Sequence, residues 1–377
     1  MNLQKLLLCL SLGLAVSATA AENGITSKSI TLGQSAALTG PAAQLGIEMR
    51  DGAQAYFDHV NASGGVGGRQ IILKTLDDGY EAEKAVANTK QLVEKDDVFS
   101  LFGYVGTATS NAALPLVAKE NLPFFAPFTG AQSLREPFNR NIFNIRASYF
   151  EETEKIIQHI TTLSLNRIAV FYQDDAYGKT GLEGVVRAMK KRNIEIVATA
   201  TVERNSVDVS KAVAQMKKAK PQAIVMISAY TSCAAFIKSM LKDGDVSPIF
   251  WNISFVGSQA LSKELGAEGR GVMISQVMPA PWDDINPVVK EYKSLYLKTP
   301  GRVPGYVSLE GFIAAKVFVE GLKRAGSNLS RESFIKAMEG INSHDVGGFQ
   351  VKFGNNNHNA SHFVDLTVIG KDGKFMR

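Results

Sequence analysis

The chain has 377 residues, of which 45% are hydrophobic and 20% are charged, and this composition excludes a disordered or low-complexity protein. The length is long for one hydrophobic core and sufficient for two domains. The 41 basic and 36 acidic side chains are spread along the chain and leave a formal net charge of +5. So mild and dispersed a charge does not indicate a nucleic-acid-binding surface.

The first twenty residues have the pattern of a secretory signal peptide. Lys5 precedes an apolar run from Leu6 to Val16, and Ala18-Thr19-Ala20 forms an A-x-A cleavage site. The apolar run is too short to span a bilayer. We therefore expect a soluble periplasmic protein, cleaved after residue 20 or 21. Cys233 would then be its single cysteine, so an internal disulfide is excluded.

Strand and helix patterns alternate over the first part of the mature chain. Leu45, Met49, Ala53, Tyr56 and Val60 recur at helical spacing, and a glycine-rich segment follows them. Such a β-α series predicts a parallel sheet with helices on both faces. The predicted strands cover Ser29–Ser35, Gln70–Asp78, Val98–Gly103 and Leu122–Pro127, with a second helix over Glu81–Lys95 and a third ending at Glu120.

The same alternation begins again after Ser148, which predicts a second α/β unit. Three helical segments are expected between Pro287 and Met338, followed by a closing strand over Phe363–Ile369. The expected helices of the second unit are Glu151–Leu163, Thr180–Arg192, Ser206–Ala219 and Thr231–Lys242, and its strands are Arg167–Tyr172, Ile194–Val202, Ala223–Ser228, Ile249–Trp251 and Gly271–Gln276.

The segment Val98–Asn111 holds the first candidate for a binding site. An apolar run ends at Gly103, and Gly106, Thr107 and Thr109 follow where a helix could begin. Ligands of open α/β sheets bind at the carboxyl ends of strands, and a helix start favours an anion. The alternative is an ordinary strand-to-helix turn, with Thr107 or Thr109 as the N-cap residue.

Four motifs connect the chain to a known family: ITLGQSAALTGP, DGAQAYFDHVNASGGVGGR, GYVGTATSN and YQDDAYGKTG. Together they resemble the type I periplasmic solute-binding proteins of ABC transporters, of the leucine/isoleucine/valine-binding group. The resemblance implies two Rossmann-like lobes, 24–147 plus 279–353 and 148–278 plus 354–377, joined by a three-crossing hinge. It also implies a monomer that captures a small carboxylate-bearing solute by hinge closure and delivers it to membrane permease and ATPase subunits.

The resemblance also implies a set of ligand-binding residues. In this sequence they are Thr107, Thr129, Ala131, Tyr177, Tyr230, Ser254, Tyr104 and either Gln44 or Leu45. The sequence departs from the family pattern in two respects. Ser254 stands where leucine-binding relatives carry a glutamate that holds the ammonium group of the ligand. Tyr80 and Gly106 stand at the two positions of the usual disulfide of the first lobe.

The departure at Ser254 bears on the solute. A buried ammonium group needs a counter-charge, because leaving it unpaired costs about 3–5 kcal/mol. Six aromatic residues fall near strand ends, and each is either a cleft or a core residue: Tyr104, Phe128, Tyr149, Tyr177, Tyr230 and Phe255. We therefore expect a carboxylate with an apolar or aromatic body rather than an α-amino acid. The opposing possibility is that Glu310 faces the amine; Arg146 would be a hinge ion-pair residue or an anion clamp.

Other classes of function find less support. The five histidines lie apart, and His358 and His362 at i and i+4 lack the glutamate of a zinc-protease motif. Cys233 has no histidine near it in the sequence and is expected to be buried. We expect neither enzymatic activity nor a cofactor or metal. A ligand-sensing partner of a membrane receptor or kinase is the alternative function.

Overall fold

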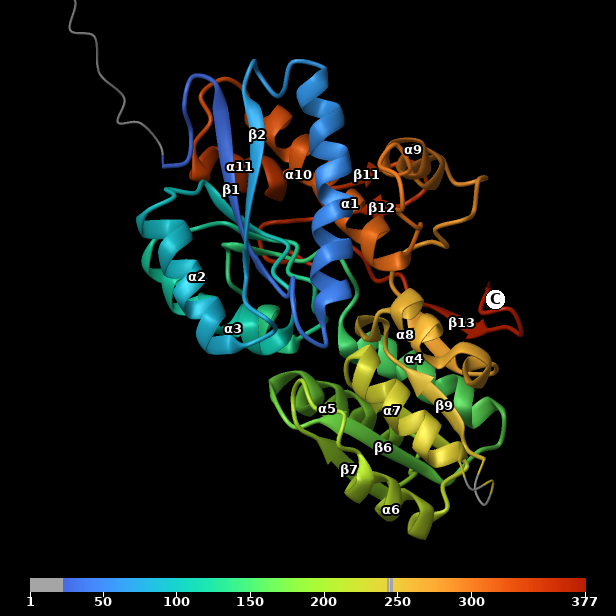
Figure 1. Cartoon of the computed structure of the whole chain (residues 1–377). Helices are drawn as coiled ribbons and strands as arrows, with labels where there is room; N and C mark the ends of the chain where they lie inside the picture. Colours follow the sequence, from blue (N-terminus) through green and yellow to red (C-terminus); the bar gives the residue numbers. More distant parts are fainter. Residues whose placement is uncertain (1–22, 243, 245–246) are drawn as a thin grey trace, which may run out of the picture.

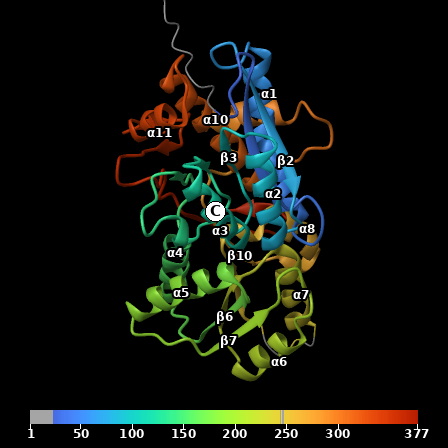
Figure 2. The ribbon, with the colours of Figure 1, turned by 90° about the vertical axis from the view of Figure 1, so that its left-hand side faces the viewer.

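A computed structural model describes residues 23–242, 244 and 247–377, and it has two lobes stacked along the long axis of the molecule (Figures 1 and 2). The expected signal peptide lies outside the described residues. Each lobe is built around its own sheet, and helices cover both faces of each sheet. The expected α/β class with two Rossmann-like lobes is therefore confirmed.

The sheet of the first lobe has five parallel strands in the order β2-β1-β3-β4-β5. Its central strands are buried on both faces, as their apolar sequences require. The strands are β1 (Ser29–Ala36), β2 (Gln70–Asp77), β3 (Ser100–Phe102), β4 (Phe124–Phe125) and β5 (Ile142–Phe143).

The sheet of the second lobe has seven strands in the order β14-β13-β10-β9-β8-β6-β7. Its core is parallel, and β13 and β14 extend it antiparallel at one edge. The strands are β6 (Ile168–Gln173), β7 (Ala198–Val202), β8 (Ala223–Ile227), β9 (Ile249–Asn252), β10 (Met273–Gln276), β13 (Asp365–Ile369) and β14 (Phe375–Met376). A separate two-stranded sheet pairs β11 (His344–Asp345) with β12 (Gln350–Val351).

The helices divide between the lobes in the same way. The first lobe carries α1 (Ala43–Ala62), α2 (Ala82–Glu94), α3 (Thr107–Lys119), α9 (Pro287–Tyr296), α10 (Tyr306–Ala325), α11 (Arg331–Glu339) and the 3₁₀ turn Gln132–Leu134. The second carries α4 (Tyr149–Thr162), α5 (Ala176–Lys190), α6 (Ser210–Ala219), α7 (Tyr230–Leu241), α8 (Ser258–Leu265) and the 3₁₀ turns Ser254–Val256 and Gly266–Gly269.

Helices α1 and α10 pack closely because glycines face the partner backbone. A β-carbon on Gly52 would lie 1.8 Å from the Ser308 carbonyl oxygen, and one on Gly311 would lie 2.2 Å from that of Met49. Tyr56 of α1 meets Phe312 of α10 edge to face, with ring centroids 5.1 Å apart. This contact joins a helix from the start of the chain to one near its end, and so completes the first lobe.

The chain passes between the two sheets three times: between β5 and β6, between β10 and α9, and between β12 and β13. At the first passage Arg146 is buried and forms a two-pronged ion pair with Glu310 of α10, with N···O distances of 2.8 and 2.9 Å. Arg146 also lies over the ring of Phe128, 4.3 Å from its centroid. The expected ion-pair role of Arg146 is thus confirmed, and Glu310 already has a cation.

Sequence periodicity located most elements but not their ends. The strands β5 and β14 and the helix α8 were not expected, because they are short and have no distinct pattern of their own. The N-cap of α3 is Gly106, with φ of 105°, and no side chain caps the helix. The alternative that Thr107 or Thr109 is the N-cap is therefore wrong; both lie inside the first turn.

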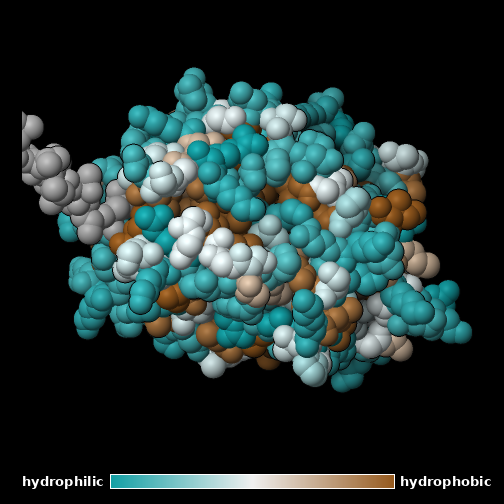
Figure 3. Space-filling view, turned by 90° about the horizontal axis from the view of Figure 1, so that it is seen from above, coloured by the Kyte–Doolittle hydropathy of each residue, from teal (hydrophilic) through white to brown (hydrophobic). Residues whose placement is uncertain are grey.

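Within the described part of the chain, no helix combines the length and the apolar character needed to cross a membrane. Viewed from above, the surface is mostly hydrophilic, with hydrophobic residues in small separate patches (Figure 3).

The side chain of Cys233, in α7, is buried, as expected from the sequence.

Candidate functional site

Three hydroxyl groups form a chain of hydrogen bonds at the carboxyl edge of the first sheet. Thr107 Oγ1 lies 2.7 Å from Thr129 Oγ1, and Thr129 Oγ1 lies 3.0 Å from the phenolic oxygen of Tyr149. The backbone N–H of Ala131 donates to Thr129 Oγ1 over 3.2 Å. All four residues are buried, and burial raises the pKa of Tyr149 to about 12, so its phenol remains a donor.

The first turn of α3 adds backbone donors to these hydroxyls. Thr107 is the first residue of the helix, so its amide and the two that follow have no acceptor within the helix. Hydroxyl and amide donors at a helix start together favour an anion such as a carboxylate. Hydroxyl and backbone donors thus gather at the end of the strand in the segment Val98–Asn111, where the sequence places a candidate site.

Aromatic rings from both lobes enclose the hydroxyls. Tyr177, the second residue of α5, has its ring 5.3 Å from Tyr149 and 4.6 Å from Phe255. Phe255 in turn lies 5.3 Å from Phe128 and 6.0 Å from Tyr80 of the first lobe. The hydroxyl of Tyr177 is buried and has no hydrogen-bond partner among the described residues. It is thus a buried polar group whose hydrogen bond the described residues do not supply.

Tyr80 and Gly106, at the two positions where the family resemblance implies a disulfide, are in contact. A β-carbon on Gly106 would lie 2.5 Å from Tyr80 Cε2, so the ring of Tyr80 packs directly on the glycine. Its hydroxyl reaches the second lobe and accepts a hydrogen bond from Gln173 Nε2 over 3.3 Å. Tyr80 therefore joins the two lobes, a contact that a disulfide within one lobe could not make.

Ser254 is held by a buried carboxylate that the sequence analysis missed. Glu152 of α4 accepts hydrogen bonds from the Ser254 amide (2.7 Å), the Ser254 hydroxyl (3.0 Å) and the Ser275 hydroxyl (2.6 Å). Burial raises the pKa of Glu152, while Arg146 and these three donors oppose that shift. The position of the missing family glutamate is therefore next to an acid from another helix, 102 residues away.

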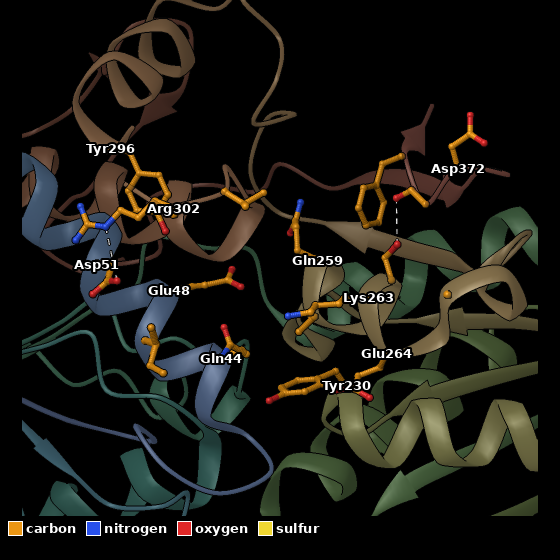
Figure 4. Close-up of a pocket in the computed structure, with 18 of the residues that line it drawn as sticks. Gln44, Glu48, Asp51, Tyr230, Gln259, Lys263, Glu264, Tyr296, Arg302 and Asp372 are labelled. Atoms are coloured by element: carbon orange, nitrogen blue, oxygen red, sulfur yellow. Dashed lines mark hydrogen bonds and ion pairs between the residues drawn. The ribbon is translucent and has the colours of Figure 1, made fainter. Parts of the chain in front are cut away.

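Gln44 and Tyr230 lie in a different place from the buried hydroxyls. Both line an open groove between the lobes with a volume of about 890 Å³ (Figure 4). Leu45 is buried and packs against the second lobe, since a β-carbon on Gly257 would lie 2.5 Å from its Cδ2 atom. Leu45 thus closes a contact across the lobes, and Gln44 faces the groove.

Tyr104 is placed in the core of the first lobe. Its ring meets Phe124 edge to face at 5.1 Å, and its hydroxyl lies 3.0 Å from Thr89 Oγ1 of α2. The side chain is therefore directed towards α2 and not towards the second lobe. Of the predicted ligand contacts, the structure brings together Thr107, Thr129, Ala131 and Tyr177. Ser254 instead donates hydrogen bonds to Glu152. Gln44 and Tyr230 lie at the groove with Leu45 beside them, and Tyr104 lies apart from both groups.

One edge of the cleft is closed by polar contacts between the lobes. Asn205 Nδ2 donates to Glu81 Oε1 over 2.7 Å and to the Gly79 carbonyl over 3.0 Å. Arg204 contacts Glu81 at 3.5 Å and Asp175 at 2.9 Å. These residues, Gly79, Glu81, Arg204 and Asn205, form the lip contact, which joins the two lobes.

The two histidines at i and i+4 do not meet at a metal site. His358 is buried, stacks on Phe143 and faces the Ile142 carbonyl through Nδ1. His362 is exposed and pairs with Glu151. Within the described residues, no group of three or more His, Cys, Asp or Glu side chains is arranged to hold a metal ion.

Two α/β lobes that meet at the carboxyl ends of their strands, with hydroxyls and aromatic rings gathered between them, are the architecture of a two-lobed binding protein. The chain belongs to the periplasmic binding protein family, whose model matches residues 29–374. It is 23% identical over 384 residues to a Leu/Ile/Val-binding protein homolog 7 of Brucella abortus, covering 97% of this chain and 95% of that protein.

Two solved structures share the fold over nearly the whole chain. One is a possible leucine/isoleucine/valine-binding protein from Rhodopirellula baltica SH 1, with 32% identity, a TM-score of 0.89 and coverage of 96% of this chain and 98% of that one. The other is a substrate-binding periplasmic protein from Ralstonia solanacearum, with 33% identity, a TM-score of 0.86 and coverage of 92% and 99%. The resemblance noted in the sequence is thus confirmed. Proteins of this family bind solutes and are not enzymes, and they work outside the cytoplasm.

Proposed function

We propose that this protein captures a small carboxylate-bearing solute between its lobes and delivers it to the permease and ATPase subunits of an ABC importer. The hydroxyl chain Thr107–Thr129–Tyr149, at the start of α3, carries the proposal. A carboxylate there would accept hydrogen bonds from the hydroxyls and from the free amides of the helix. Tyr177 would close over it from the second lobe.

The surroundings of the hydroxyls favour an apolar or aromatic body on the solute. The rings of Phe128, Tyr149, Tyr177 and Phe255 lie within 5.3 Å of at least one neighbour in this set. Neither nearby acid is free for an amine: Glu310 is paired with Arg146, and Glu152 already accepts three hydrogen bonds. A solute without an ammonium group therefore fits the charges of the cleft better than an α-amino acid.

Proteins of this fold with lower identity bind both kinds of solute. A solute-binding protein from R. palustris, 18% identical, is described in complex with benzoate, and a branched-chain amino acid transporter substrate-binding protein from Streptococcus pneumoniae, 17% identical, in complex with isoleucine. At such identities they establish the shared fold alone. The choice between the two ligand classes in this chain therefore rests on its own charges.

A competition panel tests the proposal. Each amino acid is paired with its deamino analogue, for example leucine with 4-methylpentanoate and phenylalanine with 3-phenylpropanoate, and binding is measured by thermal shift and calorimetry. We expect the carboxylate without the amine to bind more tightly in each pair. Tighter binding of the amino acid in every pair would contradict the proposed solute class, and binding of no carboxylate at all would contradict the carboxylate site.

The transport role needs a separate test. Deletion of the gene should abolish uptake of the solute identified by the panel, together with growth on it where it is a nutrient. Unchanged uptake combined with loss of a transcriptional response to the solute would favour the alternative, a sensing partner of a membrane receptor or kinase.

A further inference from the structure

Phe255 lies in the middle of the aromatic rings between the lobes. It belongs to the 3₁₀ turn Ser254–Val256 of the second lobe, and its ring centroid lies 4.6 Å from that of Tyr177 in the same lobe. It also lies 5.3 Å from the ring of Phe128 and 6.0 Å from the ring of Tyr80, both of the first lobe. Phe255 thus carries ring contacts from the second lobe to the first at this place.

The buried hydroxyls and the rings around them leave no free space beside one another. The exposed fraction is 0% for each of these residues: Thr107, Thr129, Tyr149, Tyr177 and Phe255. A space as large as a water molecule would leave part of their surface accessible. In this arrangement of the described residues, a solute held at Thr107 therefore has room for its body only where a neighbouring ring gives way.

Phe255 has fewer ties to its surroundings than the rings on the other sides. Tyr80 and Tyr149 are held by hydrogen bonds of their hydroxyls. Phe128 lies under the guanidinium group of Arg146, 4.3 Å from its ring centroid. The side chain of Phe255 has no polar atom, so its rotation breaks no hydrogen bond. It is therefore the ring of this group whose displacement costs least.

The backbone beside Phe255 is held in place. Glu152 accepts hydrogen bonds from the amide and the hydroxyl of Ser254, at 2.7 and 3.0 Å. The amide of Gly257 donates to the carbonyl of Ser254 over 3.3 Å, which closes the turn. A displacement at Phe255 is therefore one of the side chain, and a substitution there changes the space between the lobes without removing these hydrogen bonds.

We propose that Phe255 is a specificity-determining residue, whose ring lies where the body of a solute held at Thr107 must go. The inference rests on the proposed carboxylate site and names the residue of that site that selects among carboxylates by size. A small body displaces the ring little. A phenyl-sized body binds at the expense of the contacts that Phe255 makes with Phe128 and Tyr177, and this cost is subtracted from its affinity.

The test compares propanoate with 3-phenylpropanoate, which share a carboxylate and differ by a phenyl group, using calorimetry on the wild type, Phe255→Ala and Phe255→Leu. We expect Phe255→Ala to bind 3-phenylpropanoate about tenfold or more tightly than the wild type, because the phenyl group takes the volume of the missing ring. Phe255→Leu removes less volume and should show a smaller gain. The affinity for propanoate, which buries little apolar area, should change by less than about twofold.

Phe250→Ala is the matched control. Phe250 lies in β9, the strand before the turn, and is also buried, but its ring meets Phe236 within the second lobe at 6.5 Å. The loss of this ring should lower the melting temperature, as in Phe255→Ala, because both changes remove a buried phenyl group. The ratio of the affinities for the two acids should stay at the wild-type value.

An unchanged or weaker affinity for 3-phenylpropanoate in the Phe255 variants, an equal gain for both acids, or the same shift in Phe250→Ala would overturn the inference and leave the carboxylate site standing. Binding of neither acid to any of these proteins would overturn the carboxylate site, and the inference with it. Phe255→Leu, the milder change, carries the test alone if Phe255→Ala does not fold.

Discussion

Glu152 of α4 accepts hydrogen bonds from both the amide and the hydroxyl of Ser254, at 2.7 and 3.0 Å, although the two residues are 102 positions apart. The family resemblance implies an acid at the position of Ser254, and the structure places the acid Glu152 beside it. This carboxylate also accepts a hydrogen bond from Ser275, and Arg146 and these donors oppose the rise in its pKa that burial causes. The pair explains how the cleft can carry a buried negative charge that is not directed at a solute.

Glu152→Gln should therefore change stability and leave ligand preference unaltered. The new side-chain amide would place an N–H donor against the donors of Ser254 and Ser275. It would also leave Arg146 without one of its two neighbouring acids. We expect the free energy of unfolding to fall by about 3 kcal/mol, as measured by chemical denaturation. The ratio of affinities for phenylalanine and 3-phenylpropanoate should not move. A selective loss of amino-acid binding in this variant would show that Glu152 faces an amine.

Thr107→Val removes the first hydroxyl of the hydrogen-bonded series Thr107–Thr129–Tyr149 and keeps the shape of the side chain. An anion that loses one hydrogen bond should bind about 1–2 kcal/mol more weakly, which is roughly 5- to 30-fold in the dissociation constant. Calorimetry with the solute identified by the panel measures this. Thr107→Ser, which keeps the hydroxyl, is the matched control and should bind nearly as tightly as the wild type. Equal affinities for all three proteins would rule out a contact at Thr107.

Tyr177→Phe tests whether the unpartnered phenol meets the solute. The ring contacts with Tyr149 and Phe255 remain, and the hydroxyl has no described partner to lose, so the melting temperature of the free protein should stay the same or rise. Affinity for the carboxylate should fall by about 1 kcal/mol. Tyr230→Phe at the groove is the comparison and should leave carboxylate binding unchanged. A drop in free-protein stability with intact binding would make Tyr177 a core residue.

The lip contact offers a test of closure. Asn205→Ala removes the hydrogen bonds to Glu81 and the Gly79 carbonyl, which join the two lobes, without touching the hydroxyl chain. We expect the free protein to populate open forms more, with a larger radius of gyration in solution scattering and an affinity a few-fold lower. With saturating solute the radius should return to the wild-type value. An unchanged radius in the free variant would mean that the lip contact does not bias closure.

His358 predicts an acid-sensitive stability. Burial lowers the pKa of His358 to about 4, below its usual value near 6.5, even though the Ile142 carbonyl and Glu339 favour the charged form and Arg140 opposes it. Between these two values the unfolded chain binds a proton that the folded chain does not. The free energy of unfolding should therefore fall as the pH drops from 6.5 to 4, by up to about 3 kcal/mol.

Denaturation curves measured from pH 7.5 to pH 4 test this linkage. His358→Phe keeps an aromatic ring beside Phe143 and removes the titrating group, so its stability should decline less steeply over the same range. A wild-type slope that matches that of His358→Phe would mean that other groups control the acid sensitivity.

The sequence by itself determined the two α/β units, the class of protein and the strand end that carries Thr107, because these follow from local periodicity and from motifs that are contiguous in the chain. It also singled out Tyr149, Tyr177 and Phe255 as aromatic residues at strand ends, without deciding between cleft and core. The exact lobe boundaries and the identity of the solute stay predictions.

The tertiary structure decided every feature that joins distant segments. Glu152 reaches Ser254 because α4 packs against β10. Glu48 and Lys263 line one groove because α1 of the first lobe and α8 of the second lie on opposite sides of it. Tyr104, although it follows the same strand as Thr107, is directed towards α2, since neighbouring side chains leave a strand end on different faces. A linear pattern carries no information on such pairings, since they depend on how the two lobes close.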